Sequence, residues 1–115
     1  MKGKMGDKQR LQHIAEAIGE IEAYAGGKSL SDFMENSMMR FASVKQIEII
    51  GEAANLLTQE LRDNNNDVAW RQIIGLRHIL VHEYFGIDAE VIWQIIENDI
   101  PVLKERVDEM LNAIE

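Results

Sequence analysis

The fold class is decided by residues 47–61, which read Ile-Glu-Ile-Ile-Gly-Glu-Ala-Ala-Asn-Leu-Leu-Thr-Gln-Glu-Leu. Apolar side chains recur here every three or four residues, the spacing of one face of an α-helix. The face consists of Ile47, Ile50, Ala54, Leu57 and Leu61. We therefore expect one long helix that runs from about Asn36 to Arg62.

The residues before this stretch predict another helix with the same spacing. Its apolar stripe is Leu11, Ile14, Ile18, Ile21 and Ala25. Asp7 is a plausible N-cap, because a short carboxylate can accept the unpaired amide hydrogens of a first turn. Gly26 and Gly27 end the helix, because glycine tolerates a positive φ. Ser29 can cap a short helix that follows.

The residues after it predict the remaining helices. Asp67 can cap a third long helix, and Gly86 can break it. Asp88 can cap the next helix, and Pro101 fits the first turn of a last one or a kink. The inward-facing residues of these helices are Trp70, Ile73, Leu76, Leu80, Val91, Ile92, Ile95, Ile96, Leu103, Val107, Met110 and Ile114.

No stretch alternates between apolar and polar residues over a useful length, so strands are not expected. The sequence predicts an all-α fold, an antiparallel bundle of four to five helices. Its 115 residues fit a single domain over 1–115. A second apolar stripe on the long helix, formed by Ile49, Ala53 and Leu56, predicts cover from a further side and hence a homodimer.

Composition limits the functional classes. The net charge of −8 argues against a protein that coats nucleic acid, although it allows one concentrated basic site. Cysteine is absent, which excludes disulfides and thiolate chemistry. Neither an apolar run of about 20 residues nor a signal-peptide pattern is present, and we expect a cytoplasmic protein without a membrane segment.

The segment from Gly75 to Asp88 carries the chemistry. Arg77 stands out, because its neighbours one turn away are all apolar. A guanidinium in such a setting pairs with an acid, lies at an interface or receives an anionic ligand. The structural interpretation is an ion pair with Glu52 or Asp88. The functional interpretation is a position at an interface or beside an anionic ligand, and the sequence leaves both open.

Three further residues of the segment are candidates. His82 follows five residues after Arg77, about 140° around an ideal helix, while Tyr84 returns to nearly the same face as Arg77. His78 and His82 have the i, i+4 spacing of metal ligands, but the sequence offers no obvious third ligand, so no metal site is expected. No phosphate-binding loop or nucleophile elbow is present, and no cofactor is expected.

The order of these residues resembles a known signature. Arg77, His82 and Tyr84 give the pattern R-x4-H-x-Y, written RHILVHEY. This pattern resembles that of HEPN-domain ribonucleases, specifically the HepT toxins of HepT/MntA toxin–antitoxin pairs. The segments IGEAANLL at 50–57, YFGID at 84–88 and ENDIP at 97–101 also fit, so the resemblance covers nearly the whole chain.

The resemblance implies a dimeric helical bundle that cleaves RNA without a metal. It implies a composite active site of Arg77 and His82 at the dimer interface. It also implies a partner nucleotidyltransferase antitoxin that adds AMP to Tyr84. The chain departs from the family at His78, where asparagine or a small polar residue is usual. Either His78 shares in substrate binding, or the activity of this chain differs from that of the family.

Two alternatives remain beside the ribonuclease toxin. The chain could be a non-catalytic helical module that binds a nucleotidyltransferase or a nucleotide. It could also be a structural helical dimer in which Arg77 and His82 only pair internally. Cleavage of RNA by the pure protein in EDTA separates the ribonuclease toxin from both alternatives.

Overall fold

The helices account for nearly all of the described chain. The computed structural model describes residues 2–82 and 88–114, and no strand occurs in these ranges. The elements are α1 (Lys2–Ala25), α2 (Leu30–Glu35), α3 (Ser37–Asn55), α4 (Gln59–Asn64), α5 (Trp70–His82), α6 (Ala89–Gln94), the π-helical turn η1 (Ile95–Asp99) and α7 (Ile100–Ala113). The predicted all-α class is confirmed.

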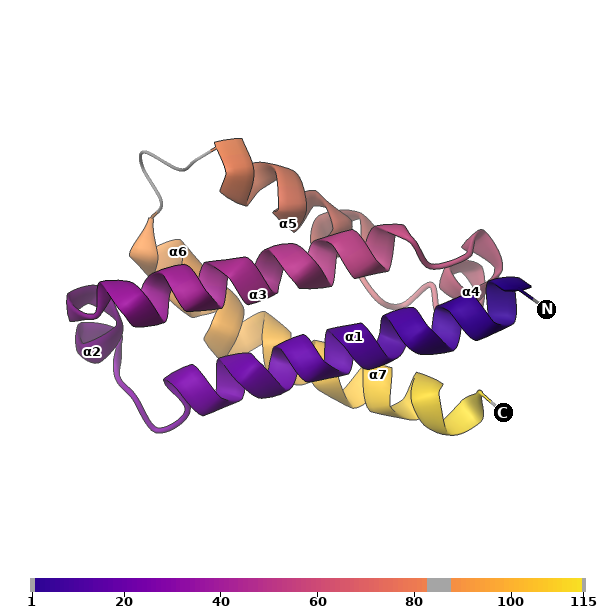
Figure 1. The fold of residues 1–115 in the computed structure, drawn as a ribbon, viewed down its shortest axis with the longest axis horizontal. Coiled ribbons are helices and arrows are strands. Elements are labelled where there is room, and N and C mark those ends of the chain that lie inside the picture. The colour runs from indigo at the N-terminus through magenta and orange to yellow at the C-terminus, as the bar shows by residue number, and fades with distance from the viewer. Residues whose placement is uncertain (1, 83–87, 115) are drawn as a thin grey trace.

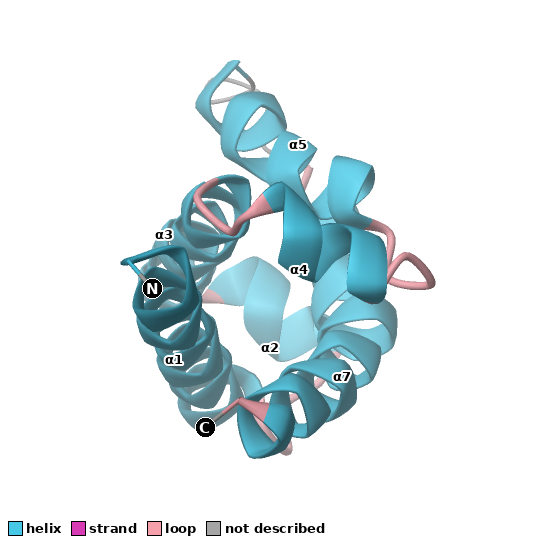
Figure 2. Ribbon diagram, turned by 90° about the vertical axis from the view of Figure 1, so that its right-hand side faces the viewer, coloured by secondary structure: helices cyan, strands magenta, loops and turns pink. Residues whose placement is uncertain are grey.

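Four long segments run antiparallel to their neighbours (Figure 1). Helix α1 lies between α3 and α7, and α3 in turn carries α5 on its other side. The short helices α2 and α4 lie at opposite ends of this arrangement. Seen along the bundle, α5 stands on the outside, against α3 (Figure 2). A helix in this position has one covered face and one face left open.

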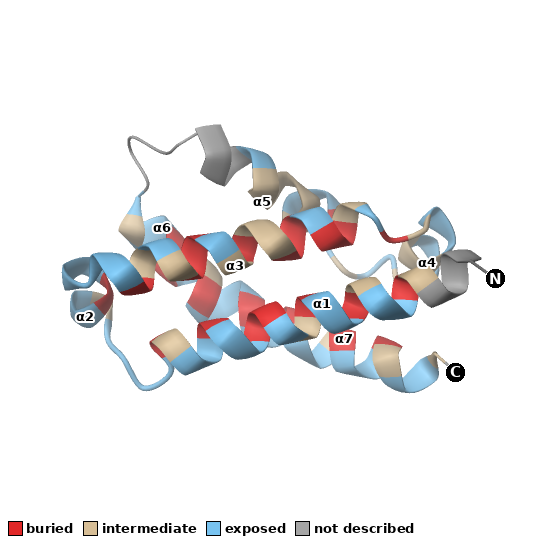
Figure 3. Cartoon of the chain, in the orientation of Figure 1, coloured by how far each residue is buried: buried red, intermediate tan, exposed pale blue. Residues whose placement is uncertain are grey.

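The predicted apolar stripes form most of the core, but the prediction is wrong for Val91, which is 49% exposed. All five stripe residues of α1 are buried, and so are Ile47, Ile50, Ala54 and Leu57. The buried positions of α1 and α3 face one another in Figure 3. Removing this much apolar surface from water is the main force that holds the helices together. None of the described helices is both long and apolar enough to cross a membrane.

The helix predicted over 36–62 is interrupted, so that prediction is wrong in its length. Helix α3 ends at Asn55, and α4 begins at Gln59. Thr58 adopts an extended conformation between them, and its hydroxyl accepts a hydrogen bond from the backbone N–H of Leu61. The apolar spacing continues across this break, which is why the sequence pattern conceals it.

Asp7 does not cap its own helix as predicted, because α1 already begins at Lys2. Its carboxylate is buried and accepts two hydrogen bonds from Thr58. The backbone N–H donates at 2.8 Å and the hydroxyl at 2.6 Å. Asp7 therefore anchors α1 to the turn that separates α3 from α4.

Asp67 was predicted to cap α5, and this is also wrong, because α5 begins three residues later at Trp70. Asp67 instead accepts hydrogen bonds from Arg106 of α7, from Nε at 3.1 Å and from an Nη atom at 3.0 Å. These bonds from the Arg106 guanidinium lower the pKa of Asp67 below its ordinary value. The loop that precedes α5 is thus held against α7.

Other end signals behave as predicted. Ser29 caps α2 with a complete capping box, and Gly27 has a φ of 75° after α1. Asp88 caps α6 by accepting from the backbone N–H of Glu90 at 2.9 Å. Pro101 lies in the first turn of α7, directly after the π-helical turn. The predicted break at Gly86 lies outside the described residues.

The second apolar stripe on α3 is not a uniform exposed surface. Ala53 is buried within the single chain and Ile49 is half-buried. Leu56 is 51% exposed. Only part of the stripe therefore remains as a possible contact for another copy.

Candidate active site on helix α5

Helix α5 differs from the other described helices in its charge. Its sequence, WRQIIGLRHILVH, contains two arginines and two histidines and no acidic residue. Each other helical segment in 2–82 and 88–114 carries at least one Asp or Glu. In a chain of net charge −8, α5 is therefore the one described helix with a net positive charge, which comes from Arg71 and Arg77.

Gly51 allows α5 to approach α3 closely. A Cβ atom on Gly51 would lie 3.0 Å from the backbone nitrogen of Arg77 and 3.0 Å from the carbonyl oxygen of Ile73. Such a separation is tighter than ordinary van der Waals contact, so a side chain here would force the two helices apart. Gly51 thus fixes how deeply Arg77 sits against α3.

Glu52, the next residue of α3, holds the Arg77 guanidinium. The Nη1 atom of Arg77 lies 3.3 Å from Oε1 of Glu52. The Arg77 side chain is 28% exposed and that of Glu52 is 58% exposed, so the pair lies at the surface edge of the α3–α5 contact. Of the two acids that the sequence offered as partners for Arg77, Glu52 and Asp88, the structure has the pair with Glu52.

This pair leaves part of the guanidinium available. An arginine has five N–H donors, and Glu52 engages it through one nitrogen. The Nε atom of Arg77 is buried and has no hydrogen-bond partner among the described residues. A half-exposed guanidinium with donors to spare is suited to a phosphate, which accepts several hydrogen bonds at once.

The structure describes the other predicted site residues only in part. His78 is exposed and follows Arg77 on the outer side of α5. His82 is the last residue of α5, and its side chain lies outside what the structure describes, as does the whole of Tyr84. The structure therefore brings together Arg77 and Glu52, and the roles of His82, His78 and Tyr84 stay predictions.

Sequence reasoning overlooked two residues of this helix pair. The closeness of Gly51 to α5 was missed, although small residues in the GEAA segment at 51–54 are a signal for close helix packing. Arg71, the second residue of α5, was missed as well. The signal that could have found it is the absence of any acidic residue from α5. No group of three His, Cys, Asp or Glu side chains gathers as a metal site among the described residues.

Comparison with known proteins identifies the family to which the chain belongs. The family model described as "Ribonuclease HepT-like" matches residues 14–110, which include both α3 and α5. The chain therefore belongs to the HepT-like ribonuclease family.

Three curated relatives are similar to the chain over nearly their whole length. A candidate RNase of Methanocaldococcus jannaschii is 35% identical over 88% of this chain and 93% of its own. Another candidate RNase, from Caldanaerobacter subterraneus, is 38% identical over 88% and 90%. A "Probable ribonuclease HepT" of Thermococcus cleftensis is 34% identical over 93% and 97%. No solved structure matches the chain at a comparable level of significance.

Proposed function

We propose that this protein is the toxin of a type VII-like toxin–antitoxin pair, a cytoplasmic RNA endonuclease that needs no metal. Arg77 and His82 form its composite active site where two copies meet. Membership of a ribonuclease family supports the substrate class. The order R-x4-H-x-Y in residues 77–84 supports the residue assignment.

One observation carries the proposal. The fold positions Arg77 against α3, because Gly51 sets its depth and Glu52 holds its guanidinium. The side chain remains reachable from solvent at 28% exposure. A phosphate-binding arginine must be both held and reachable, and Arg77 meets both conditions.

The residues suit cleavage by the neighbouring 2′-hydroxyl of RNA. A base removes the hydroxyl proton, the O2′–P bond forms, and the P–O5′ bond breaks. An acid then supplies a proton to the leaving O5′, so that a 2′,3′-cyclic phosphate and a 5′-hydroxyl result. Histidine titrates near neutrality and can serve as base or acid. The Arg77 guanidinium stabilises negative charge on the phosphorane.

A homodimer supplies what one chain lacks. Each chain has one motif histidine, and the reaction needs a base and an acid. A twofold axis that brings two copies of α5 together would provide two histidines and two arginines. Sedimentation at micromolar concentration tests the pairing: we expect a mass near twice 13.1 kDa, and a mass near 13.1 kDa would contradict it.

Tyr84 is proposed as the switch. A partner nucleotidyltransferase would add AMP to its hydroxyl, and the new phosphate would compete with RNA for Arg77. Co-expression with such a partner, followed by mass spectrometry, tests this. We expect one or more AMP units on the peptide that contains Tyr84, and none in Tyr84→Phe. A neutralised protein with unmodified Tyr84 would contradict the switch.

A non-catalytic binding module is the second candidate. The Arg77–Glu52 pair favours it, because Glu52 already neutralises the charge that the reaction would use. Incubation of the pure protein with single-stranded RNA in EDTA separates the two candidates. Cleavage to products that end in a cyclic phosphate supports the ribonuclease, while tight RNA binding without cleavage supports the module.

A further inference from the structure

Four positions of α5 share one stripe of the helix. Residues 71, 75, 78 and 82 are spaced by four, three and four, which places them within about 60° of one another around an ideal helix. From residue 71 to residue 82 the stripe is about 16 Å long. It lies away from the face that contacts α3, where Ile73 and Arg77 meet Gly51.

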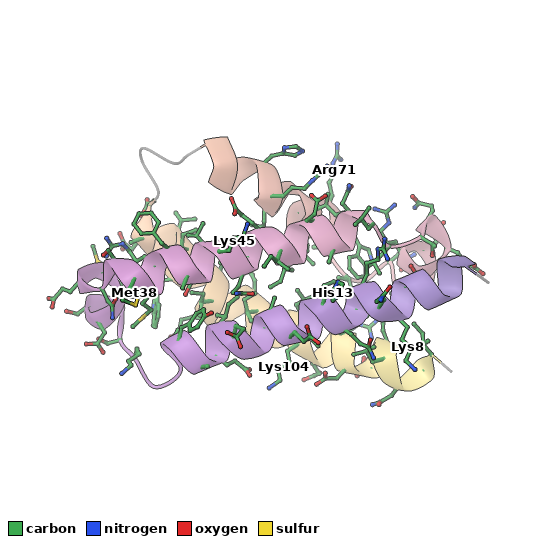
Figure 4. The ribbon with its side chains drawn as sticks, in the orientation of Figure 1. Lys8, His13, Met38, Lys45, Arg71 and Lys104 are labelled. Atoms are coloured by element: carbon green, nitrogen blue, oxygen red, sulfur yellow. The ribbon has the colours of Figure 1, made fainter. Side chains whose placement is uncertain are left out.

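Arg71 begins this stripe with an uncompensated charge. It is exposed, and it has no acidic partner among the described residues. Figure 4 shows it on the outer side of α5, pointing away from α1 and α3. Three other cations differ in this respect, since Arg77, Lys104 and Arg106 are each paired with an acid.

Gly75 leaves the middle of the stripe open. A Cβ atom on Gly75 would meet nothing within 4 Å, in contrast to the crowded Gly51. A glycine in a helix costs about 1 kcal/mol relative to alanine, and no packing among the described residues requires this one. The uncovered helix backbone between Arg71 and His78 lets an extended ligand lie close to α5.

A hollow adjoins the start of the stripe. Its volume is about 500 Å³, and its lining includes Arg62, Arg71, Gln72, Asn66 and Trp70. Most of the polar lining groups are hydrogen-bond donors. The one acid there, Asp63, already accepts a hydrogen bond from the Gln59 amide at 2.8 Å.

These observations point to a strand of nucleic acid as the ligand. The exposed Arg71, on a helix without acids, attracts a phosphate, and the amide groups of Gln72 and Asn66 in the hollow can hydrogen-bond a nucleotide base. The length of the stripe corresponds to several nucleotides of a stacked strand, in which successive phosphates are about 3.4 Å apart along the strand axis.

We propose that the outer face of α5 is a binding track for single-stranded RNA, in which Arg71 holds a phosphate several nucleotides from the cut and the adjoining hollow receives the neighbouring nucleotide. The track rests on the proposed ribonuclease function and extends it. It leads the strand across Gly75 and His78 to position 82, the proposed catalytic histidine.

Kinetics with Arg71→Ala and substrates of two lengths test the track. The parent should prefer a longer single strand to a dinucleotide, because only the longer strand reaches Arg71. Arg71→Ala should raise KM for the longer strand about tenfold and lose most of this preference. It should also reduce the slope of log affinity against log salt by about 0.7, the share of one phosphate contact. Lys8→Ala, an exposed cation on α1, is the matched control.

A second pair of variants excludes a merely structural effect. Gly75→Glu places an acid in the track, and Gly19→Glu makes the same change on α1, where a Cβ also meets nothing within 4 Å. Both should fold at least as stably as the parent, since glutamate is the better helix former. Only Gly75→Glu should bind the longer RNA more weakly, by about tenfold.

The outcomes separate this inference from the proposed function. If the parent cleaves RNA but Arg71→Ala and Gly75→Glu match their controls, the track is wrong and the ribonuclease stands. If Gly75→Glu changes the sedimenting mass of the parent, this face is a contact between copies and the track is also wrong. If the parent neither binds nor cleaves RNA, the proposed function itself fails.

Discussion

The backbone nitrogen of Arg77 lies 3.0 Å from the point where a Cβ atom on Gly51 would stand. The two helices therefore touch through backbone at the residue on which the proposed chemistry depends. Close packing transmits small volume changes, so even one methyl group here should displace α5.

Gly51→Ala should reduce RNA cleavage by about tenfold or more, because a shift of a few tenths of an ångström moves Arg77 relative to its partner residues. Its stability should change by at most about 1–2 kcal/mol, since the gain in helix propensity offsets part of the crowding. Gly19→Ala, where a Cβ meets nothing within 4 Å, is the control and should cleave at the parental rate. A parental rate for Gly51→Ala would show that this contact does not position the site.

Glu52→Gln tests what the ion pair does for Arg77. The amide keeps the shape of the side chain but loses the charge that holds the guanidinium at 3.3 Å. We expect kcat to fall, because Arg77 becomes less well positioned, while KM for RNA falls or stays constant, because one repelling acid is gone. Glu48→Gln, one turn earlier on α3, is the control. An unchanged kcat for Glu52→Gln would contradict a positioning role.

Asp7→Ala should destabilise the fold by about 1.5–3 kcal/mol, the usual cost of losing hydrogen bonds to a buried charged group. Thr58→Ala removes the hydroxyl bond to Asp7 and keeps the backbone N–H bond, so Asp7→Ala and Thr58→Ala should be partly non-additive, through the one bond that both remove. Urea denaturation of the two single variants and the double variant measures this. Additive changes would mean that the two residues act independently.

The Asp67–Arg106 pair predicts a pH dependence of stability. The folded chain lowers the pKa of Asp67 below its ordinary value of 3.8, mainly through the hydrogen bonds from Arg106. The stabilisation is therefore complete above that ordinary value and is lost as the pH falls through the lowered pKa. The difference in Tm between the parent and Asp67→Asn should shrink between neutral pH and about pH 2. In an Arg106→Gln background the shrinkage should disappear, and its persistence there would assign it to another group.

The sequence was most informative where one face of a helix is simply apolar. The stripes of α1 and α3 were predicted residue by residue, because burial repeats with the helical period. The break at Thr58 and the late start of α5, three residues after Asp67, were not predicted. Each depends on a polar contact with a residue distant in sequence, Asp7 or Arg106, and a local pattern contains no such information.

Only part of the candidate site could be predicted from the sequence. An ion pair of Arg77 with Glu52 or Asp88 followed, as one of the open interpretations, from a charge among apolar neighbours, and the structure has the pair with Glu52. The role of Gly51 did not, because within one helix a glycine indicates only a loss of propensity, and its value lies in the backbone of another helix.

The central claim is that Arg77 and His82 cleave RNA, and cleavage by variants of these two residues in EDTA tests it most directly. We expect the parent to produce 2′,3′-cyclic phosphate ends, and Arg77→Ala and His82→Ala each to lose about 10²–10⁴ in rate while the helical circular dichroism remains. His78→Asn, which restores the residue type usual in the family, should retain more activity than either. Cleavage by both alanine variants at the parental rate would contradict the account.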